Sequence, residues 1–388
     1  MRRKAYVGIA AAAAILICAA VLIHMVRAQS FMAEAGRMAE SLLAEKLGTA
    51  VHIGAVEIRS LHELALDDVV IYDKQAEAVL RADEARVTLR LLSLLSAPET
   101  SVDEILLTGA HAEIVQRADG TWNYSDLGRD DAEPSSFEGR IRMEGATATV
   151  TAGEHTYELD GITGAVDVDR SDVSYDLTGA LAGVPLHVRG TYVGGTQELY
   201  LAAEDADLTP LLKFLPEGAL PEEVQVHRVH AGHVGLKLRR TDGVLTLDGR
   251  VDSAQGAANI YGTETQLKSS ALTFNERSLF LAATAEAAGQ TARVDGTIRF
   301  DTDAPYLDLT LRAKDFAVDQ ILPSSSYVGA VTADVHVTGT FAAPMAEGHL
   351  SAAEGAVDDV SFRAVSADVS YADGTISFHD LTAEIFDG

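Results

Sequence analysis

The densest group of metal-binding side chains is the run VHRVHAGHV, which contains His227, His230 and His233. On a helix, this spacing of three would bring the imidazoles toward one ion, as a zinc site requires. On a strand, His230 faces away from the other two, and His227 lies ~20 Å from His233. Apolar residues alternate with polar ones around the histidines, which favours the strand and predicts that the run binds no metal.

Other catalytic and binding motifs are incomplete. The run DVDRSD (167–172) begins like a calcium-binding loop, but Asp172 replaces the required turn glycine and Thr178 stands at the glutamate position. The sequence contains no phosphate-binding loop, no G-x-S-x-G elbow and no H-E-x-x-H motif. We therefore expect a protein that is not an enzyme and that needs no cofactor.

The segment RADGTWNYSDL (117–127) holds the only tryptophan of the chain, directly after an Asp-Gly pair. Trp122, Asn123 and Tyr124 on a loop could line an active site or could fix a turn. Asp119 and Gly120 suit the positive φ angles of a tight turn. The residues alone leave both interpretations open.

Composition narrows the classes of partner. Acidic residues number 58 and basic residues 30, so the net charge is −28. This balance excludes nucleic acid, whose binding footprint is basic, and argues against electrostatic adhesion to anionic lipid. The single cysteine, Cys18, allows neither an intramolecular disulfide nor a cysteine zinc site. Hydrophobic residues make up 47% of the chain and aromatic residues 6%, so the apolar surface is mostly small and aliphatic.

The N-terminus predicts a membrane anchor. A basic tail at residues 1–4 precedes residues 5–26, which carry no fixed charge. As a helix this run would extend ~33 Å, enough to cross a bilayer core, with the tail cytoplasmic and the bulk of the chain exported. A signal peptide cleaved before Gln29 is the alternative, but the apolar run exceeds the usual length. An amphipathic helix is predicted at 30–48, with Gly48 as its C-cap.

From Val51 onward the hydrophobic period changes from 3.6 to 2. The runs ARVTLRL, YLDLTLRA and ADVHVTG place apolar residues at every second position, the pattern of half-buried antiparallel strands. Short helices are expected only at Leu91–Glu99, Ala206–Gly218 and Asp315–Ser324. Asp-Gly pairs, which favour tight hairpin turns, begin at Asp119, Asp160, Asp242, Asp248, Asp295, Asp373 and Asp387. The predicted fold is mainly β, a long meander of hairpins.

Internal similarity predicts a repeat of roughly 100 residues. GRVDSAQGA (249–257) resembles GHLSAAEGA (348–356), and the segments that end at Pro216 and Pro323 are also similar. The polar stretch at 130–136 marks a boundary. The predicted organisation is a β domain at 49–130, a β-meander at 137–205, and repeat units at 206–313 and 314–388.

Alternating strands create an apolar face that must be covered. Because few helices are available, the sheet either closes on itself as a sandwich or barrel, or curls into an open trough that holds something other than protein. The alternating pattern is compatible with both the closed and the open arrangement. The residues predicted to line the face are Val166, Val168, Tyr175, Leu177, Leu199, Leu201, Leu236, Leu238, Leu245, Leu247, Ile298, Phe300, Leu307, Leu309, Leu311, Val335 and Val337.

The first third of the chain resembles the opening domain of AsmA-like proteins. After the anchor and helix come LGTAVHIGAVEIRSLHELALDDVVIYD (47–73), RADEARVTLRLLSLL (81–95) and VDEILLTGAHAEIVQRADGTWNYSDL (102–127). The segment ILPSSSYVGAVTADVHVTGTFAAPMAEGHLSAAEGAV (321–357) is similar to repeats of the TamB-like branch, the inner-membrane subunit of the translocation and assembly module. TamB-like proteins are longer and carry a distinctive C-terminal domain, so the chain resembles the N-terminal part of one.

The resemblance implies a single-pass inner-membrane protein that extends into the periplasm as an elongated, curled antiparallel β-sheet. It implies a hydrophobic groove that conducts phospholipid toward the outer membrane, with acyl chains as ligands and an outer-membrane barrel protein as a further partner. A protein-assembly role, in which sheet edges pair with client strands, remains the alternative, as does a scaffold of closed sandwiches. In this family DGTWN is structural, so a structural role is expected for Asp119, Gly120, Trp122 and Asn123.

Overall fold

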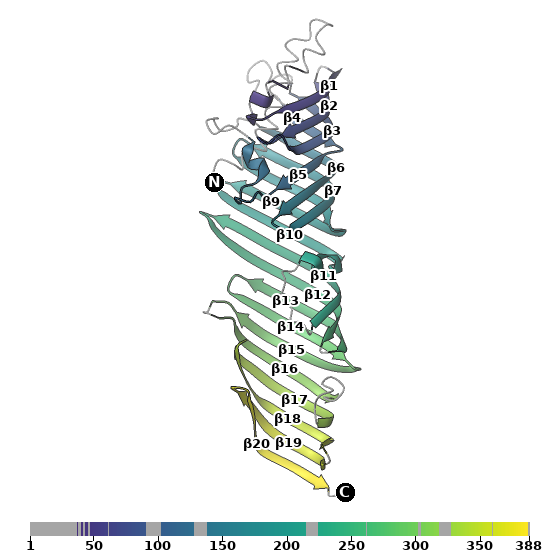
Figure 1. The fold of residues 1–388 in the computed structure, drawn as a ribbon, viewed down its shortest axis with the longest axis vertical. Helices are drawn as coiled ribbons and strands as arrows, with labels where there is room; N and C mark the ends of the chain where they lie inside the picture. Colours follow the sequence, from purple (N-terminus) through teal and green to yellow (C-terminus); the bar gives the residue numbers. More distant parts are fainter. Residues whose placement is uncertain are drawn as a thin grey trace. The chain divides into compact units, whose positions relative to one another are not determined.

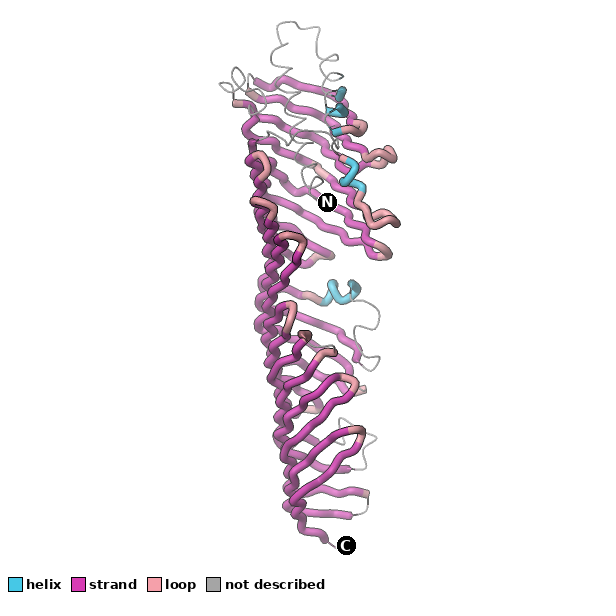
Figure 2. Tube along the Cα trace, turned by 90° about the vertical axis from the view of Figure 1, so that its left-hand side faces the viewer, coloured by secondary structure: helices cyan, strands magenta, loops and turns pink. Residues whose placement is uncertain are grey.

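The computed structural model is mainly β, as the alternation predicts. It describes residues 37, 40–41, 43–45, 47–60, 62–90, 102–127, 138–214, 224–260, 262–301, 304–317, 327–358 and 360–386, which form twenty strands and two short 3-10 helices. Figure 1 shows the strands in chain order, and Figure 2 shows how little helix accompanies them. None of the helices within these residues is long and apolar enough to cross a bilayer. The predicted tail at 1–4 and span at 5–26 lie outside the described residues.

The C-terminal part of the predicted helix at 30–48 is described in pieces and is helical at Arg37, at Glu40 and Ser41, at Leu43–Glu45 and at Leu47. Gly48 has a φ of +67°, and its N–H donates to the Ala44 carbonyl at 2.8 Å. This left-handed residue ends the helix as a glycine C-cap does.

The chain divides into two compact units. The first runs to Leu201 and includes Arg239–Val244; the second comprises Ala202–Leu238 and the chain from Leu245 onward. Strands β10 (Thr196–Asp207), β11 (Val224–Thr241) and β12 (Val244–Ile260) contribute residues to both units.

Unit 1 contains one crossover in an otherwise antiparallel ladder. Strands β1, β2, β3 and β4 pair antiparallel in order. Both β4 and β5 then pair parallel with β6, and β6 to β9 continue antiparallel. Parallel pairing needs a long connection, which the stretch between β5 and β6 supplies. The strands are β1 (Val51–Ser60), β2 (Glu63–Tyr72), β3 (Ala78–Leu89), β4 (Val102–Thr108), β5 (His111–Val115), β6 (Glu138–Ala152), β7 (His155–Asp169), β8 (Asp172–Leu181) and β9 (Val184–Val193).

A closed hydrophobic core lies at the start of unit 1. Leu43 and Leu47, from the amphipathic helix, and Leu64 and Val87, from β2 and β3, are fully buried in one cluster. Full burial of each such side chain contributes ~1.5–3 kcal/mol of hydrophobic stabilisation. The helix therefore covers the apolar face of the first strands.

Unit 2 is an antiparallel meander from β12 to β20, in which each strand pairs with the next in the chain. A 3-10 helix at Thr209–Phe214 follows β10, within the range predicted to be helical. The strands after β12 are β13 (Thr263–Asn275), β14 (Ser278–Ala287), β15 (Gln290–Arg299), β16 (Tyr306–Ala317), β17 (Tyr327–Thr340), β18 (Ala343–Val357), β19 (Val360–Ala372) and β20 (Thr375–Phe386).

The structure corrects the prediction that every Asp-Gly pair forms a hairpin turn. The pairs at Asp242 and Asp373 do form turns, and the pair at Asp119 lies in the turn after β5. The pairs at Asp160, Asp248 and Asp295 lie inside β7, β12 and β15, and Asp387 lies outside the described residues. In β15 the glycine is needed for a different reason: Gly296 has a φ of +152°, and a Cβ there would lie 2.2 Å from the Asp308 carbonyl oxygen.

Bulges interrupt the strands of unit 2. Ser253, Asp315, Ala364 and Asp380 have φ near +50°, and the strand register shifts close to each. A bulge inserts one residue, bends the strand and increases its twist. The helix predicted at Asp315–Ser324 is wrong in its described part, because Asp315–Ala317 completes β16. After the extra residue of this bulge, apolar side chains still lie opposite one another, because Phe316 pairs with Val331.

Candidate functional site

The register of unit 2 aligns apolar side chains into rows that cross the strands on one face, here called the apolar face. Because side chains alternate, residues paired across neighbouring strands share a face. One row contains Val251, Leu272, Leu281, Gly296, Leu309, Val337, Ala346, Tyr371 and Ile376. The next contains Ala254, Ser270, Ala283, Val294, Leu311, Val335, Gly348, Val369 and Phe378.

The side chains of the apolar face are half-buried, unlike those of the unit 1 core. Leu309, Leu311, Val335 and Val337 are all in this intermediate class, whereas Leu307 is 6% exposed. The extensive contacts among the described elements from β13 to β20 join neighbouring strands of the sheet. Lateral packing within the sheet therefore contributes to the partial burial of this face.

A third row on the apolar face is mostly glycine and alanine. It contains Gly256, Leu267, Ala285, Ala292, Ala313, Ala333, Leu350 and Ala367. The bulged residues Ser253, Asp315 and Ala364 lie within three residues of this row. Small side chains fit where strands bend, because the inside of a bend has little room. They also let a ligand approach the backbone closely.

The opposite face of unit 2, the polar face, carries cross-strand ion pairs. Arg312 lies between Asp295 and Asp334, with N–O distances of 3.1 and 3.4 Å. His336 contacts Asp308 at 2.7 Å. These side chains are mostly exposed, so each pair adds little stability but keeps the face hydrated.

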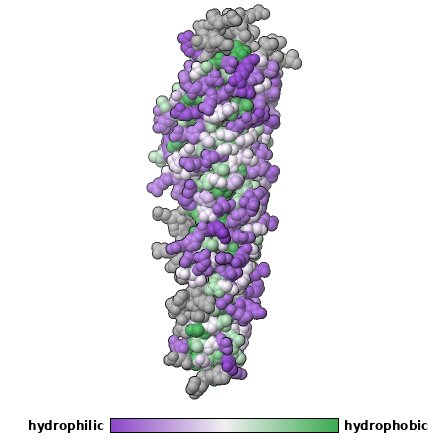
Figure 3. Space-filling model, turned by 90° about the vertical axis from the view of Figure 1, so that its right-hand side faces the viewer, coloured by the Kyte–Doolittle hydropathy of each residue, from purple (hydrophilic) through white to green (hydrophobic). Residues whose placement is uncertain are grey.

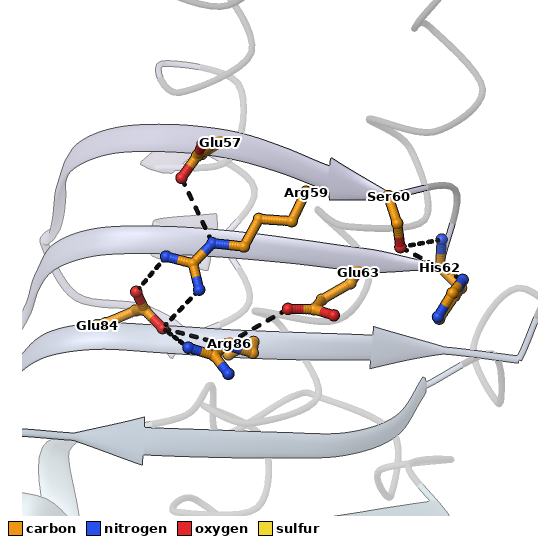
Figure 4. A network of polar contacts seen from close by, with 7 residues as sticks. All are labelled: Glu57, Arg59, Ser60, His62, Glu63, Glu84 and Arg86. Carbon is orange, nitrogen blue, oxygen red and sulfur yellow. Dashed lines mark hydrogen bonds and ion pairs between the residues drawn. The ribbon is translucent and has the colours of Figure 1, made fainter.

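The outer surface of unit 1 carries a denser charge network (Figure 4). Glu84 on β3 accepts from Arg59 at 2.6 Å and from Arg86 at 2.8 Å, and Arg59 and Arg86 also contact Glu57 and Glu63. The hydrogen bond from Arg86 is the largest of the effects that lower the pKa of Glu84. Burial alone would lower the pKa of Arg59, but its carboxylate neighbours raise it.

The structure distributes the predicted lining residues over both units. Val168 is 4% exposed in the core of unit 1, and Val166 packs against that core. Leu245 and Phe300, at turn ends of unit 2, are 59% and 45% exposed. Burial raises the pKa of the half-buried Tyr175. The half-buried members of the set are Tyr175, Leu177, Leu199, Leu201, Leu236, Leu238, Leu247, Ile298, Leu309, Leu311, Val335 and Val337.

The register adds lining residues that the prediction missed. Leu272, Leu281, Val294 and Val369 stand in the same rows as the predicted residues. In SLFLAATAEA the leucines at 279 and 281 alternate, which could have predicted that they share a face. The apolar Phe280 between them hides this alternation in the sequence, although its ring is 52% exposed on the polar face.

The tryptophan segment forms a hydrogen-bonded turn. Asn123 is 2% exposed, its Oδ1 accepts from the Val115 and Tyr124 amides at 3.0 and 2.9 Å, and its Nδ2 donates to the Glu113 carbonyl at 2.7 Å. The Trp122 and Tyr124 rings stack with centroids 6.0 Å apart. Every polar atom of the Asn123 amide group thus serves the backbone around it.

Two further contacts hold the same turn. The Asp119 carboxylate accepts from the Thr121 hydroxyl and amide at 2.6 and 2.9 Å, and these bonds lower the pKa of Asp119. Arg117 reaches the buried Asp73 carboxylate at 2.9 Å, and Asp73 also accepts from two amides of its own turn. The Arg117–Asp73 contact therefore ties the turn after β5 to the turn between β2 and β3.

The three histidines lie on β11, as the strand interpretation requires. His233 contacts Glu204 at 2.7 Å, and His230 contacts Asp205 at 3.2 Å. Within the described ranges there is no group of three or more metal-ligating side chains.

A cavity of about 490 Å³ among the described residues lies in unit 1. Its wall includes the pairs Arg90–Asp103 and Arg140–Asp167, at 2.9 and 2.7 Å. Acidic side chains outnumber basic ones in this wall.

Figure 3 shows one side of the molecule, on which hydrophobic residues are interspersed among hydrophilic ones. No protein-family model, curated protein or solved structure matches the chain.

Proposed function

We propose that the chain is an inner-membrane-anchored, periplasmic β-trough protein that conducts phospholipid between the inner and outer membranes. The observation that carries the proposal is the apolar face of unit 2, whose rows of half-buried side chains run from β12 to β20. Bulges would curl the sheet around this face, and the polar face would keep the other side in water.

Acyl chains suit this face chemically. Each methylene that leaves water contributes ~0.8 kcal/mol, so a chain lying along the rows gains affinity from length and needs no specific polar contact. The small-residue row gives a path along which a flexible chain can approach the backbone. Ser270, a polar member of these rows, is 6% exposed, and its hydroxyl donates to the Ala254 carbonyl.

Photocrosslinking from paired positions tests the proposal. A photoreactive residue at Leu309 or Val335 places the probe on the apolar face, whereas Thr310 and His336 are register partners on the polar face of the same strands. In the full chain in its membrane, we expect phospholipid adducts from Leu309 and Val335 and background from Thr310 and His336. Equal lipid yields from the two faces, or none from either, would refute the lipid path.

A further inference from the structure

The turn after β5 carries a pair of aromatic side chains outside the core. Among the described tyrosines, Tyr124 alone is exposed, at 37%, and it lies beside the half-buried Trp122, the single tryptophan of the chain. The two rings are nearly parallel, at 21°, with centroids 6.0 Å apart. Neither ring belongs to the core cluster of the described residues, whereas Asn123 between them is buried.

The turn holds this aromatic pair in a fixed position. The side-chain amide of Asn123 bonds three backbone groups, and Gln116 forms a β-bridge with Trp122. Arg117 ties the same turn to the buried Asp73. Side chains that are already ordered lose little conformational entropy when they meet a partner. The pair is therefore a preformed contact surface.

The chemistry of the pair matches the boundary between water and hydrocarbon. Each ring has an apolar body and a polar end, the indole N–H or the phenol O–H. Partial burial raises the pKa of Tyr124, so its hydroxyl stays a neutral donor. Tryptophan and tyrosine are enriched at membrane–water interfaces, where the ring body lies among acyl chains and the polar end among head groups. Exposed rings of unit 2, such as Phe280 and Phe300, have no polar end.

The core of unit 1 links this turn to the segment that is predicted to enter the membrane. Leu127 directly follows the 3-10 helix Asn123–Asp126 and is 5% exposed. It packs in the same cluster as Leu43 and Leu47 of the amphipathic helix. That helix follows the predicted span at 5–26. One core therefore joins the aromatic turn to the helix next to the predicted anchor.

We propose that Trp122 and Tyr124 lie in the head-group layer of the membrane that holds the anchor, and that they fix how unit 1 sits against it. This inference rests on the anchoring stated in the proposed function. The partner is the interface of zwitterionic phospholipid, because a net charge of −28 opposes adhesion to anionic lipid. Insertion of aromatic rings at the interface needs no cationic side chain.

The single tryptophan makes this contact directly measurable. The full chain is reconstituted in phosphatidylcholine vesicles whose acyl chains carry bromine either near the head group or near the methyl end. Bromine quenches only indoles close to it, so we expect Trp122 to lose most emission with the shallow bromines. The matched control combines Trp122→Phe with Phe280→Trp, which moves the indole to a 52% exposed position on β14. Its emission should be unchanged in both lipids.

A further variant tests the part that Tyr124 plays. Tyr124→Asp places a charge beside the indole and should reduce the quenching by shallow bromines, since a charge opposes insertion. Because Tyr124 is exposed and lies outside the core cluster, the melting temperature should stay unchanged. Quenching equal to that of the unmodified chain would contradict a contact made by the pair.

Vesicle flotation distinguishes failure of this inference from failure of the proposed function. In a chain that floats with the vesicles, an unquenched Trp122 overturns the interfacial contact and leaves the anchoring intact. Stronger quenching by the deep bromines, or equal quenching of the Phe280→Trp control, overturns the contact as well. A chain that does not float overturns the proposed anchoring, and this inference with it.

Discussion

At the scale of single residues, the polar groups that first suggest chemistry are occupied with structure. Asn123 satisfies three backbone groups, Asp119 holds Thr121, and His233 contacts Glu204. A catalytic group must have an atom free to contact a substrate. Both the oxygen and the nitrogen of the Asn123 side-chain amide are already hydrogen-bonded to the backbone. The resemblance predicted this structural role for the DGTWN turn, and the geometry explains it.

Replacement of Asn123 should therefore act on stability. Asn123→Ala leaves the Val115 amide and the Glu113 carbonyl without their partner, which costs about 2–3 kcal/mol. Asn123→Asp keeps the acceptor and should cost less. Urea unfolding followed by near-ultraviolet circular dichroism of Trp122 measures both. Unchanged midpoints would show that these hydrogen bonds contribute nothing.

The Glu84 network predicts a pH dependence for unit 1. Arg86 and Arg59 lower the pKa of Glu84, so the network stabilises the fold above the ordinary glutamate pKa of ~4.3, and this stability is lost as pH falls through the lowered value. Glu84→Gln should cost about 1 kcal/mol or less at pH 7. At a pH well below the lowered pKa of Glu84, the two proteins should unfold alike. An equal difference at both pH values would contradict the electrostatic account.

At the scale of elements, alternation predicted the strands because side-chain period is a local property of the sequence. It did not predict the bulges, since Asp315 and Ala364 look like ordinary members of DFAVDQ and FRAVS until the register is known. Nor did it separate Asp-Gly turns from Asp-Gly pairs inside strands. Gly296 faces a neighbouring carbonyl, a contact set by pairing with residues downstream. The parallel pairing of β4 and β5 with β6 is equally non-local.

Gly296 gives a test of that close approach. In Gly296→Ala the new methyl would meet the Asp308 carbonyl at 2.2 Å, with φ at a value that only glycine adopts readily. Strain of about 1–3 kcal/mol should separate β15 from β16. Thr297→Ala, the next residue on the polar face, is the control and should have a small effect. Differential scanning calorimetry compares the two, and equal melting temperatures would refute the role of the glycine.

At the scale of the whole molecule, the two units differ in how deeply their apolar side chains are buried. Unit 1 buries Leu43, Leu47 and Leu64 in a closed core, whereas unit 2 leaves Leu309 and Val335 half-buried. The net charge of −28 then belongs to surfaces that remain in water. The sequence predicted an apolar face but left a closed sandwich and an open face equally possible, because alternation is the same in both.

One comparison of melting and lipid crosslinking distinguishes an open lipid-binding face from a closed core. Leu309→Asp in a closed core would bury an unpaired carboxylate at a cost of several kcal/mol, enough to unfold a marginal domain. On an open face, water reaches the carboxylate while the charge blocks the acyl path. We therefore expect the full chain with Leu309→Asp to melt near the temperature of the unmodified protein and to lose lipid adducts from a photoreactive residue at Val335. Unfolding of the variant, together with no lipid adducts in the unmodified protein, would contradict the lipid conduit and favour a closed structure.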